Sequence, residues 1–250
     1  MGGLSHRRAP RVAALLVSSL AACAFDPGGG SGAPGDAGAG GGGGPDGGPI
    51  GAAPPVRDSG AAGCPVASDL LACLEFDGVA EDGSSYRNPI QVDGSPSYAT
   101  GVEGGALDAG EGADLTISET SILDPSAALL IEVWLRPDSF PADGDRAGLV
   151  DNDNQWGLFA HAGGRVSCSM NGYLEVDALL TIGQWHHLAC AYDGGAIRLF
   201  LDGAEVGQVA AGGSLPIGGT SGTAIGRNGP SGQYFDGQMD ELLIWQRGTL

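Results

Sequence analysis

Short runs in which apolar and polar residues alternate limit what this chain can fold into. Such runs recur about every 8–12 residues from Leu70 onward, and no stretch holds a 3.6-residue period. A period of two predicts β-strands, because successive side chains of a strand point to opposite faces. The predicted strands are Leu70–Phe76, Ala106–Ala109, Asp114–Ser118, Leu129–Arg136, Ala147–Asp151, Gly157–Ala160, Val166–Met170, Tyr173–Val176, His186–Tyr192, Ile197–Leu201, Ala204–Ala210, Thr223–Ile225 and Phe235–Trp245.

Asp-Gly and Asn-Gly pairs separate several of these runs, and such pairs favour two-residue hairpin turns. Asp193-Gly194 and Asp202-Gly203 predict a meander of three strands between His186 and Ala210, and Asn171-Gly172 predicts another hairpin. Many short antiparallel strands without helices predict an all-β fold. In that fold two antiparallel sheets pack as a sandwich or jelly roll.

The first residues are typical of a secretory signal peptide. Arg7, Arg8 and Arg11 form a basic start, and the apolar run from 12 to 20 is too short to span a bilayer as a mature helix. The segment Leu20-Ala21-Ala22-Cys23 resembles the bacterial lipobox. The remaining interpretation is an ordinary soluble-secreted signal in which Cys23 is incidental.

The lipobox resemblance implies that residues 1–22 are removed and that Cys23 carries acyl chains. Several chains on one residue give stable membrane anchoring. Ala24 follows the cysteine in place of Asp, which resembles sorting to the outer membrane. We therefore expect an exported protein anchored by lipid to a bacterial membrane, at the outer membrane or the cell surface.

A Gly-, Ala- and Pro-rich linker follows, from 23 to 63. It holds almost no large apolar residue and includes five consecutive glycines at 40–44, so it cannot bury enough surface to offset its ordering entropy. We expect a disordered coil with a reach of roughly 35 Å. Residues 64–250 are then expected to form one domain, held away from the membrane.

The charge of the chain excludes several partners. The chain has 11 basic residues, none of them lysine, against 30 acidic ones, so its formal net charge is −19. Nucleic acid requires a basic stripe that releases counterions from phosphates. The charge also argues against heparin-like polyanions and anionic lipid surfaces.

The segments 185–194 (WHHLACAYDG) and 197–203 (IRLFLDG) resemble the LamG-like jelly-roll family of the concanavalin A-like lectin/glucanase superfamily. Three further segments resemble the same family in the same order: 104–107 (GGAL), 131–137 (IEVWLRP) and 235–245 (FDGQMDELLIW). The resemblance covers about 69–247 and implies a concanavalin A-like sandwich. It does not identify a ligand, because this fold supports many functions. The family often continues past the segment that ends this sequence, so we expect a clipped C-terminus.

Five cysteines are present, and lipidation of Cys23 leaves an even number in an exported domain. We predict the disulfides Cys64–Cys73 and Cys168–Cys190, which is one of three possible connectivities. The second pair also resembles a cross-strand bridge of the family. A zinc site is the alternative, but no Cys-x2-Cys unit supports it.

An Asp- and Asn-rich loop follows the first predicted strand and offers the hard oxygen ligands that Ca²⁺ prefers. The residues and the family resemblance together predict a calcium site formed by Asp77, Asp82, Asn88 and Asp240. The other interpretation is that these residues cap turns. A second acidic loop holds Asp143, Asp145, Asp151 and Asp153, and we expect it to be solvated.

No catalytic motif emerges from the sequence. Laminarinase-like enzymes of this fold use Glu-x-Asp-x-x-Glu or the same motif shortened by one residue; the segment 111–114 lacks this spacing. Gly-x-Ser-x-Gly and His-Glu-x-x-His are also absent. His186 and His187 are adjacent on a strand and therefore cannot chelate one metal from one face.

A sugar site requires an exposed aromatic ring with amides and carboxylates beside it. The most polar loop predicts ligand-binding roles for Asn152, Asn154, Gln155 and Trp156. Trp156 also opens a predicted strand, so the alternative is that it packs inward. Further candidates for such a role are Asn171, Tyr173, Asn228 and Tyr234. In contrast, Trp134, Trp185 and Trp245 belong to strand motifs and are expected in the core.

The sequence therefore predicts a non-catalytic module of a lipid-anchored surface protein, binding a carbohydrate or another surface protein. A protein–protein adhesion or scaffolding module is the first alternative. A glycoside hydrolase is the remote one. Nothing in the sequence chooses between a glycan and a protein as the ligand.

Overall fold

Two antiparallel sheets face each other, which confirms the prediction of an all-β sandwich. The structure is a computed structural model that describes residues 63–110, 112–152, 155–177, 180–229 and 232–248. The predicted signal peptide 1–22, Cys23 and the linker up to residue 62 lie outside the described residues. Within the described ranges, no helix is long and apolar enough to cross a membrane.

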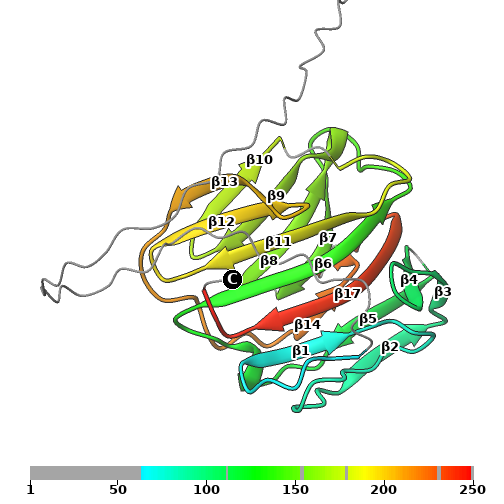
Figure 1. The fold of residues 1–250 in the computed structure, drawn as a ribbon, viewed down its shortest axis with the longest axis horizontal. Helices are drawn as coiled ribbons and strands as arrows, with labels where there is room; N and C mark the ends of the chain where they lie inside the picture. Colours follow the sequence, from blue (N-terminus) through cyan, green and yellow to red (C-terminus); the bar gives the residue numbers. More distant parts are fainter. Residues whose placement is uncertain (1–62, 111, 153–154, 178–179, 230–231, 249–250) are drawn as a thin grey trace, which may run out of the picture. The chain divides into compact units, whose positions relative to one another are not determined.

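The first sheet has eight strands. Figure 1 shows its central strands side by side, with β17 between β6 and β1. In spatial order the sheet contains β13 (Ala204–Ala210), β12 (Ala196–Leu201), β11 (His186–Tyr192), β6 (Leu129–Pro137), β17 (Gly237–Trp245), β4 (Gly105–Ala109) and β3 (Ser97–Thr100), and β1 (Leu70–Leu74) pairs with part of β17. The predicted meander is confirmed as β11, β12 and β13.

The second sheet has seven strands. In spatial order they are β10 (Tyr173–Val176), β9 (Val166–Met170), β8 (Trp156–His161), β7 (Arg146–Asn152), β14 (Thr223–Ile225), β5 (Ala113–Ile117) and β2 (Ile90–Gly94). A short hairpin of β15 (Arg227–Asn228) and β16 (Gln233–Tyr234) lies against β7, where a β-carbon on Gly148 would come within 2.2 Å of the Arg227 carbonyl oxygen. The helical elements of the described ranges are two 3-10 turns, η1 (Ser121–Leu123) and η2 (Ala162–Gly164).

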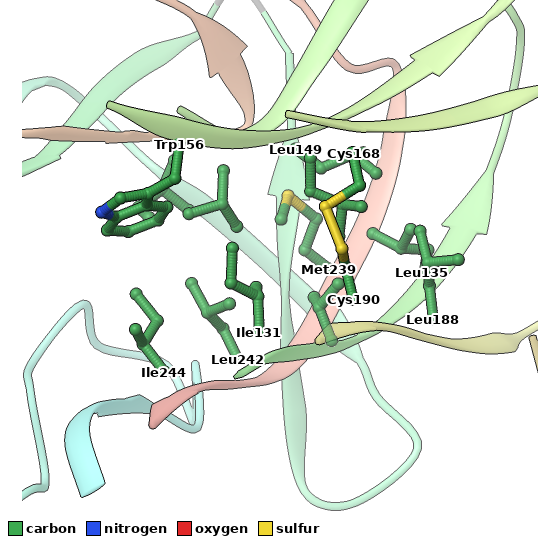
Figure 2. Close-up of a cluster of buried hydrophobic side chains, with 14 of the residues drawn as sticks. Ile131, Leu135, Leu149, Trp156, Cys168, Leu188, Cys190, Met239, Leu242 and Ile244 are labelled. Carbon is green, nitrogen blue, oxygen red and sulfur yellow. A yellow bond between two sulfur atoms is a disulfide. The ribbon is translucent and has the colours of Figure 1, made fainter. Parts of the chain in front are cut away.

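The core lies between the sheets and is built from the inward positions of the alternating strands. Figure 2 shows Leu149, Trp156 and Cys168 of the second sheet pointing toward residues of the first sheet such as Ile131 and Leu242. All five are at most 2% exposed. Burying such apolar side chains stabilises the fold by about 1.5–3 kcal/mol each.

Both predicted disulfides are present, and they differ in position. Cys168 on β9 bonds Cys190 on β11, so this bridge crosses the core from one sheet to the other (Figure 2). Cys64 bonds Cys73 on β1, nine residues later. This second bridge packs against Gly83, where a β-carbon would come within 2.4 Å of the Cys64 sulfur.

The outward side of the first sheet carries a second apolar cluster, and we name this side the closed face. Its buried members are Leu70, Cys73, Leu130, Ala189, Ala191, Phe200, Leu243 and Trp245. Cys64 and Ala67, in the segment preceding β1, pack over the cluster. The guanidinium of Arg247 lies 3.7 Å from the centre of the Trp245 ring. The N-terminal segment and its disulfide thus cover a face that would otherwise expose apolar side chains.

Candidate functional site

Three of the four residues predicted to bind sugar are buried: Asn152, Gln155 and Trp156. Trp156 is 2% exposed, and its Nε1 donates a hydrogen bond to the Leu123 carbonyl oxygen at 3.2 Å. Of the two placements open for Trp156, the structure has the inward one, because this residue begins β8 on the inward side. Asn152 donates to the same carbonyl, and Gln155 donates to Asp124 and Pro216. Both amides are buried and hold η1 and the loop after it; Asn154 lies outside the described residues.

The other predicted polar candidates divide between two places. Asn171 donates to the Gly212 carbonyl oxygen at 3.0 Å and supports a turn. Asn228 and Tyr234 lie on the β15–β16 hairpin, and Tyr173 begins β10. Tyr173 is 49% exposed, which makes it a large aromatic residue open to solvent on the second sheet.

The outward side of strands β7 to β10 brings polar side chains together, and we name this side the open face. Strand pairing places Arg146 opposite His161, Phe159 opposite Ser167, and Ser167 opposite Glu175. These positions alternate with core residues such as Leu158, Ala160 and Cys168. The alternation of each strand therefore points them away from the core.

Tyr173 and Glu175 are two residues apart on β10 and share the open face. The phenol of Tyr173 donates a hydrogen bond to Glu175 Oε2 at 2.7 Å, and Arg165 pairs with the other carboxylate oxygen. The hydrogen bond from Tyr173, assisted by His161 and Arg165, lowers the pKa of Glu175. Because its hydroxyl is tied to the neighbouring side chain along the strand, the Tyr173 ring is held in place while remaining half exposed.

His161 lies between this group and Arg146. Its Nε2 lies 2.7 Å from the Ser167 hydroxyl, and the side chain is buried. Burial lowers the pKa of His161; Arg165 and Arg146 lower it further, and the charge of Glu175 opposes them. At neutral pH the imidazole is therefore uncharged, with one donor and one acceptor nitrogen.

Arg146 continues the open face toward the hairpin. Its guanidinium carbon lies 4.0 Å from the centre of the Phe159 ring, and one of its nitrogens donates to Asn228 Oδ1 at 3.5 Å. Gly157 lies under the same ring, since a β-carbon there would come within 2.6 Å of it. The small residue lets the Phe159 ring lie close to the sheet with the guanidinium above it.

A pocket of about 520 Å³ opens beside Arg146 at this end of the open face. Tyr234, Gln233 and Asp145 contribute polar groups to its wall, together with Asp236. The Tyr234 phenol donates to Asp114 Oδ1 at 2.7 Å, and Gln233 donates to Asp145 Oδ1 at 3.3 Å. Hydroxyl, amide, carboxylate and guanidinium groups thus meet in one hollow, the donor and acceptor set that fixes polar ligands in pockets.

The four residues predicted to bind calcium do not form one group in the structure. Asp82 is buried and accepts five hydrogen bonds, from the backbone of Cys73, Ser84 and Asn88 and from the side chains of Ser84 and Asn88. The Asn88 amide also donates to the Leu71 carbonyl oxygen. The prediction of Asp82 as a ligand is therefore wrong: its carboxylate is saturated by donors. Asp82 and Asn88 instead tie the loop to β1.

Asp77 and Asp240 remain close to each other. Asp240 is fully buried and accepts hydrogen bonds from the backbone of Val102 and Glu103, while Asp77 accepts one from Gly105. Burial, together with the charge of Asp77, raises the pKa of Asp240 to about 6, although its backbone donors oppose the shift. In the described part of the chain, no three His, Cys, Asp or Glu side chains converge as metal ligands. Asp77 follows β1 and Asp240 lies on β17, and both carboxylates accept hydrogen bonds from the backbone of residues 102–105.

The aspartates of the second acidic loop differ in their exposure to solvent. Asp143 and Asp145 are exposed, as expected, whereas Asp151 is buried and accepts a hydrogen bond from the Gly229 backbone at 2.9 Å. Asp153 lies outside the described residues.

The two adjacent histidines have separate partners. His186 Nδ1 lies 2.8 Å from Asp202, whereas His187 Nε2 lies 3.5 Å from Glu132 and its ring contacts Trp134. These separate contacts agree with the expectation that the pair does not chelate one metal. Glu111 of the rejected catalytic segment lies outside the described residues.

Comparison with known proteins agrees with this architecture. A family model described as "Concanavalin A-like lectin/glucanases superfamily" matches residues 108–249, more than half of the chain. The chain therefore belongs to this superfamily, and the predicted resemblance is confirmed. No curated protein matches the chain.

Solved structures show the same fold at low identity. Domain 4 of AbnA, an extracellular arabinanase from Geobacillus stearothermophilus solved with arabinotriose, is 20% identical with a TM-score of 0.60, covering 73% of this chain and 94% of that domain. The binding domain of Paraclostridial Mosquitocidal Protein 1 is 17% identical with a TM-score of 0.58, covering 73% of this chain and 50% of that one. The binding domain of botulinum neurotoxin DC, solved with SialylT, is 11% identical with a TM-score of 0.55, covering 73% and 49%. This chain thus spans about half the length of the toxin domains.

Most residues of the open face were missed by sequence reasoning. Phe159, Ser167 and Glu175 belong to predicted strands and Arg146 directly precedes one, but only the strands of Ser167 and Glu175 were predicted to pair, and without a register. For Ser167 and Glu175 the register follows from the predicted Asn171-Gly172 turn. Such a turn fixes the register of β9 against β10 and places Ser167 and Glu175 side by side.

Proposed function

We propose that this protein is a non-catalytic carbohydrate-binding module whose site is the open face. The observation that carries the proposal is the half-exposed ring of Tyr173, held by Glu175 on a face where Arg146 and Arg165 are also partly exposed, whereas His161 and Ser167 are buried. A fixed aromatic ring offers an apolar surface to the C–H groups of a sugar, while the neighbouring polar groups bind its hydroxyls.

Two further observations support this function. The arabinanase domain and the botulinum neurotoxin domain of the same fold were solved with saccharides. In addition, the carboxylates of β7 to β10 on the open face are engaged, Glu175 by Tyr173 and Arg165 and Asp151 by the Gly229 backbone. Glycoside hydrolysis instead requires a pair of carboxyl groups placed for acid and nucleophile.

Retention of the full exported chain by immobilised polysaccharides tests the proposal. Tyr173→Ala is expected to lower retention about ten-fold or more, the size of effect that an aromatic anchor produces at a binding site. Tyr86→Ala is the matched control, because Tyr86 is also a solvent-exposed tyrosine, at 40%, but lies outside the open face. Equal loss in both variants, or no retention of the folded wild type by any glycan, would reject the proposal. The second outcome would favour a protein partner.

We propose that the carboxylates of Asp77 and Asp240 bind a calcium ion. The support is the raised pKa of Asp240, because a cation beside two carboxylates would offset both their repulsion and the burial cost. Calcium titration by calorimetry, with Asp77→Asn as the variant, tests this idea. Binding that is unchanged in the variant, or absent from the wild type, contradicts it.

We also propose that Cys23 anchors the protein by lipid to a bacterial membrane, at the outer membrane or the cell surface. The support is the sequence Leu20-Ala21-Ala22-Cys23 after a basic and apolar leader. Metabolic labelling with a fatty acid should mark the wild type and not Cys23→Ser. Equal labelling of both chains would exclude Cys23 as the site.

A further inference from the structure

The pocket at the end of the open face has a chemistry of its own. Asp145 and Asp236 bring two carboxylates to it and Arg146 brings one guanidinium, so these three side chains carry a net negative charge. Asp145 uses Oδ1 to accept from Gln233, and Asp236 uses Oδ2 to accept from Ser139. The other oxygen of each accepts no side-chain hydrogen bond from the described residues.

The net negative charge of these three side chains determines which ligand charge the pocket accepts. Two carboxylates repel a third at short range, so an acidic sugar is disfavoured in the pocket. Carboxylates that retain an accepting oxygen suit hydroxyl donors, and the Gln233 amide together with the Arg146 guanidinium supplies donors for hydroxyl oxygens. The walls also include small residues such as Gly110, Ala142 and Gly232, which leave room for a ring. The pocket therefore matches one neutral sugar unit.

Arg146, which lines the pocket, and Tyr173 lie on the outward side of the same sheet, and the residues between them form a buried floor, with Phe159 2% and Ser167 0% exposed. Arg146 lines the pocket and also covers the Phe159 ring, and Phe159 is opposite Ser167 in the sheet. Ser167 in turn is opposite Glu175, which holds Tyr173. From β7 to β10 there are three strand spacings, a span of about 14 Å. A single sugar ring cannot cover that distance, whereas a short chain can.

We propose that the ligand is a neutral oligosaccharide chain, with one unit in the pocket beside Arg146 and the following units lying across the open face to Tyr173. This inference rests on the proposed carbohydrate-binding function and adds the charge, the length and the direction of the ligand. The chain would run across the strands, from β7 to β10.

Calorimetry of the full exported chain tests this arrangement with neutral arabino- and gluco-oligosaccharides of one to five units. Affinity is expected to rise with length and then level off once the chain reaches Tyr173. Arg146→Ala should lower affinity about ten-fold for every length, and Tyr173→Ala should lower it about ten-fold only for the longer members. Arg136→Ala, which removes a half-buried arginine from the first sheet, is the matched control and should change nothing.

A second measurement checks the charge selection. Galacturonate oligosaccharides should bind more weakly than neutral ones, and the double variant Asp145→Asn/Asp236→Asn should narrow that difference. The inference is overturned if wild-type protein binds glycans through Tyr173 but shows no dependence on length, or if Arg146→Ala binds as well as the wild type. In both cases the proposed function survives. Absence of glycan binding by folded wild-type protein instead removes the proposed function itself.

Discussion

The two outward faces of the sandwich use the same alternation of side chains with opposite results. On the closed face the outward positions are apolar, including Leu130, Phe200 and Leu243, and the segment around Cys64 covers them. On the open face the outward positions are mostly polar; Glu175 and Tyr173 are exposed, whereas Phe159, His161 and Ser167 are buried, Phe159 with the Arg146 guanidinium over its ring. Apolar residues on an outward face therefore need to be covered and stabilise the fold. Polar residues on an outward face can stay accessible to a ligand.

The largest expected contrast is at Phe200, which is 1% exposed on the closed face. Phe200→Ala should lower the free energy of unfolding by about 3–5 kcal/mol, because it removes apolar contacts and leaves a cavity. Urea unfolding measures this loss, and glycan retention of the folded protein should be unchanged. A loss below about 1 kcal/mol would mean that the closed face is not a second core.

The bridge between the sheets should have the next largest effect. Replacing both Cys168 and Cys190 with Ala removes a crosslink of 22 residues, with an expected loss of about 3 kcal/mol from the release of constraint on the unfolded chain. The melting temperature with and without the pair gives the result, and the Cys64→Ala/Cys73→Ala double variant is the control for loss of a bridge outside the core. A variant as stable as the wild type would show that packing alone holds the two sheets together.

Asp240 gives a smaller effect that depends on pH. Its pKa is raised to about 6, so the folded protein binds this proton more tightly than the unfolded chain, in which the pKa is about 4. Stability should therefore rise as pH falls from 7 toward 4, by about 2 kcal/mol from this group. Calcium bound between Asp77 and Asp240 should reverse the trend above pH 6, because it favours the ionised form.

Melting temperatures between pH 4 and pH 7.5, with calcium and with EDTA, test this expectation. Asp240→Asn should flatten the dependence in EDTA. If the variant keeps the wild-type slope, another group is responsible.

The smallest expected change in stability is at Tyr173. Because its ring is half exposed, Tyr173→Ala should alter the free energy of unfolding by about 0.5 kcal/mol or less, while its effect on glycan retention is large. Chemical denaturation of the variant measures this. A destabilisation of several kcal/mol would make Tyr173 a structural residue and erase the contrast between the two faces.

Strands with strong alternation were predictable from the sequence, and weak ones were not. The runs 166–170, 173–176 and 186–192 match β9, β10 and β11 to the residue. The sequence carries no signal for β2 and β3, because both are edge strands in which no residue is fully buried. Apolar periodicity reports burial on one side, and a strand without buried residues lacks that signal.

Site residues were harder to predict because they depend on contacts between distant segments. Asp82 looked like a cation ligand, but five donors from β1 and its own loop occupy it. Trp156 looked like a platform, but its position in β8 turns it inward. Composition identifies which groups are present, whereas the pairing of strands decides which side of the sheet each one faces.

The Cys64–Cys73 bridge also determines how the domain responds to a mechanical load. A pull on the chain before Cys64 passes through the sulfur–sulfur bond to the end of β1, so residues 65–72 form a closed loop that carries no tension. The strand paired with β17 then bears the force at Cys73, which is opposite Leu243 in the register. Tension therefore cannot strip residues 65–72, which include Ala67, from the apolar cluster of the closed face by stretching them one by one. Rupture must begin within the β1–β17 pairing itself.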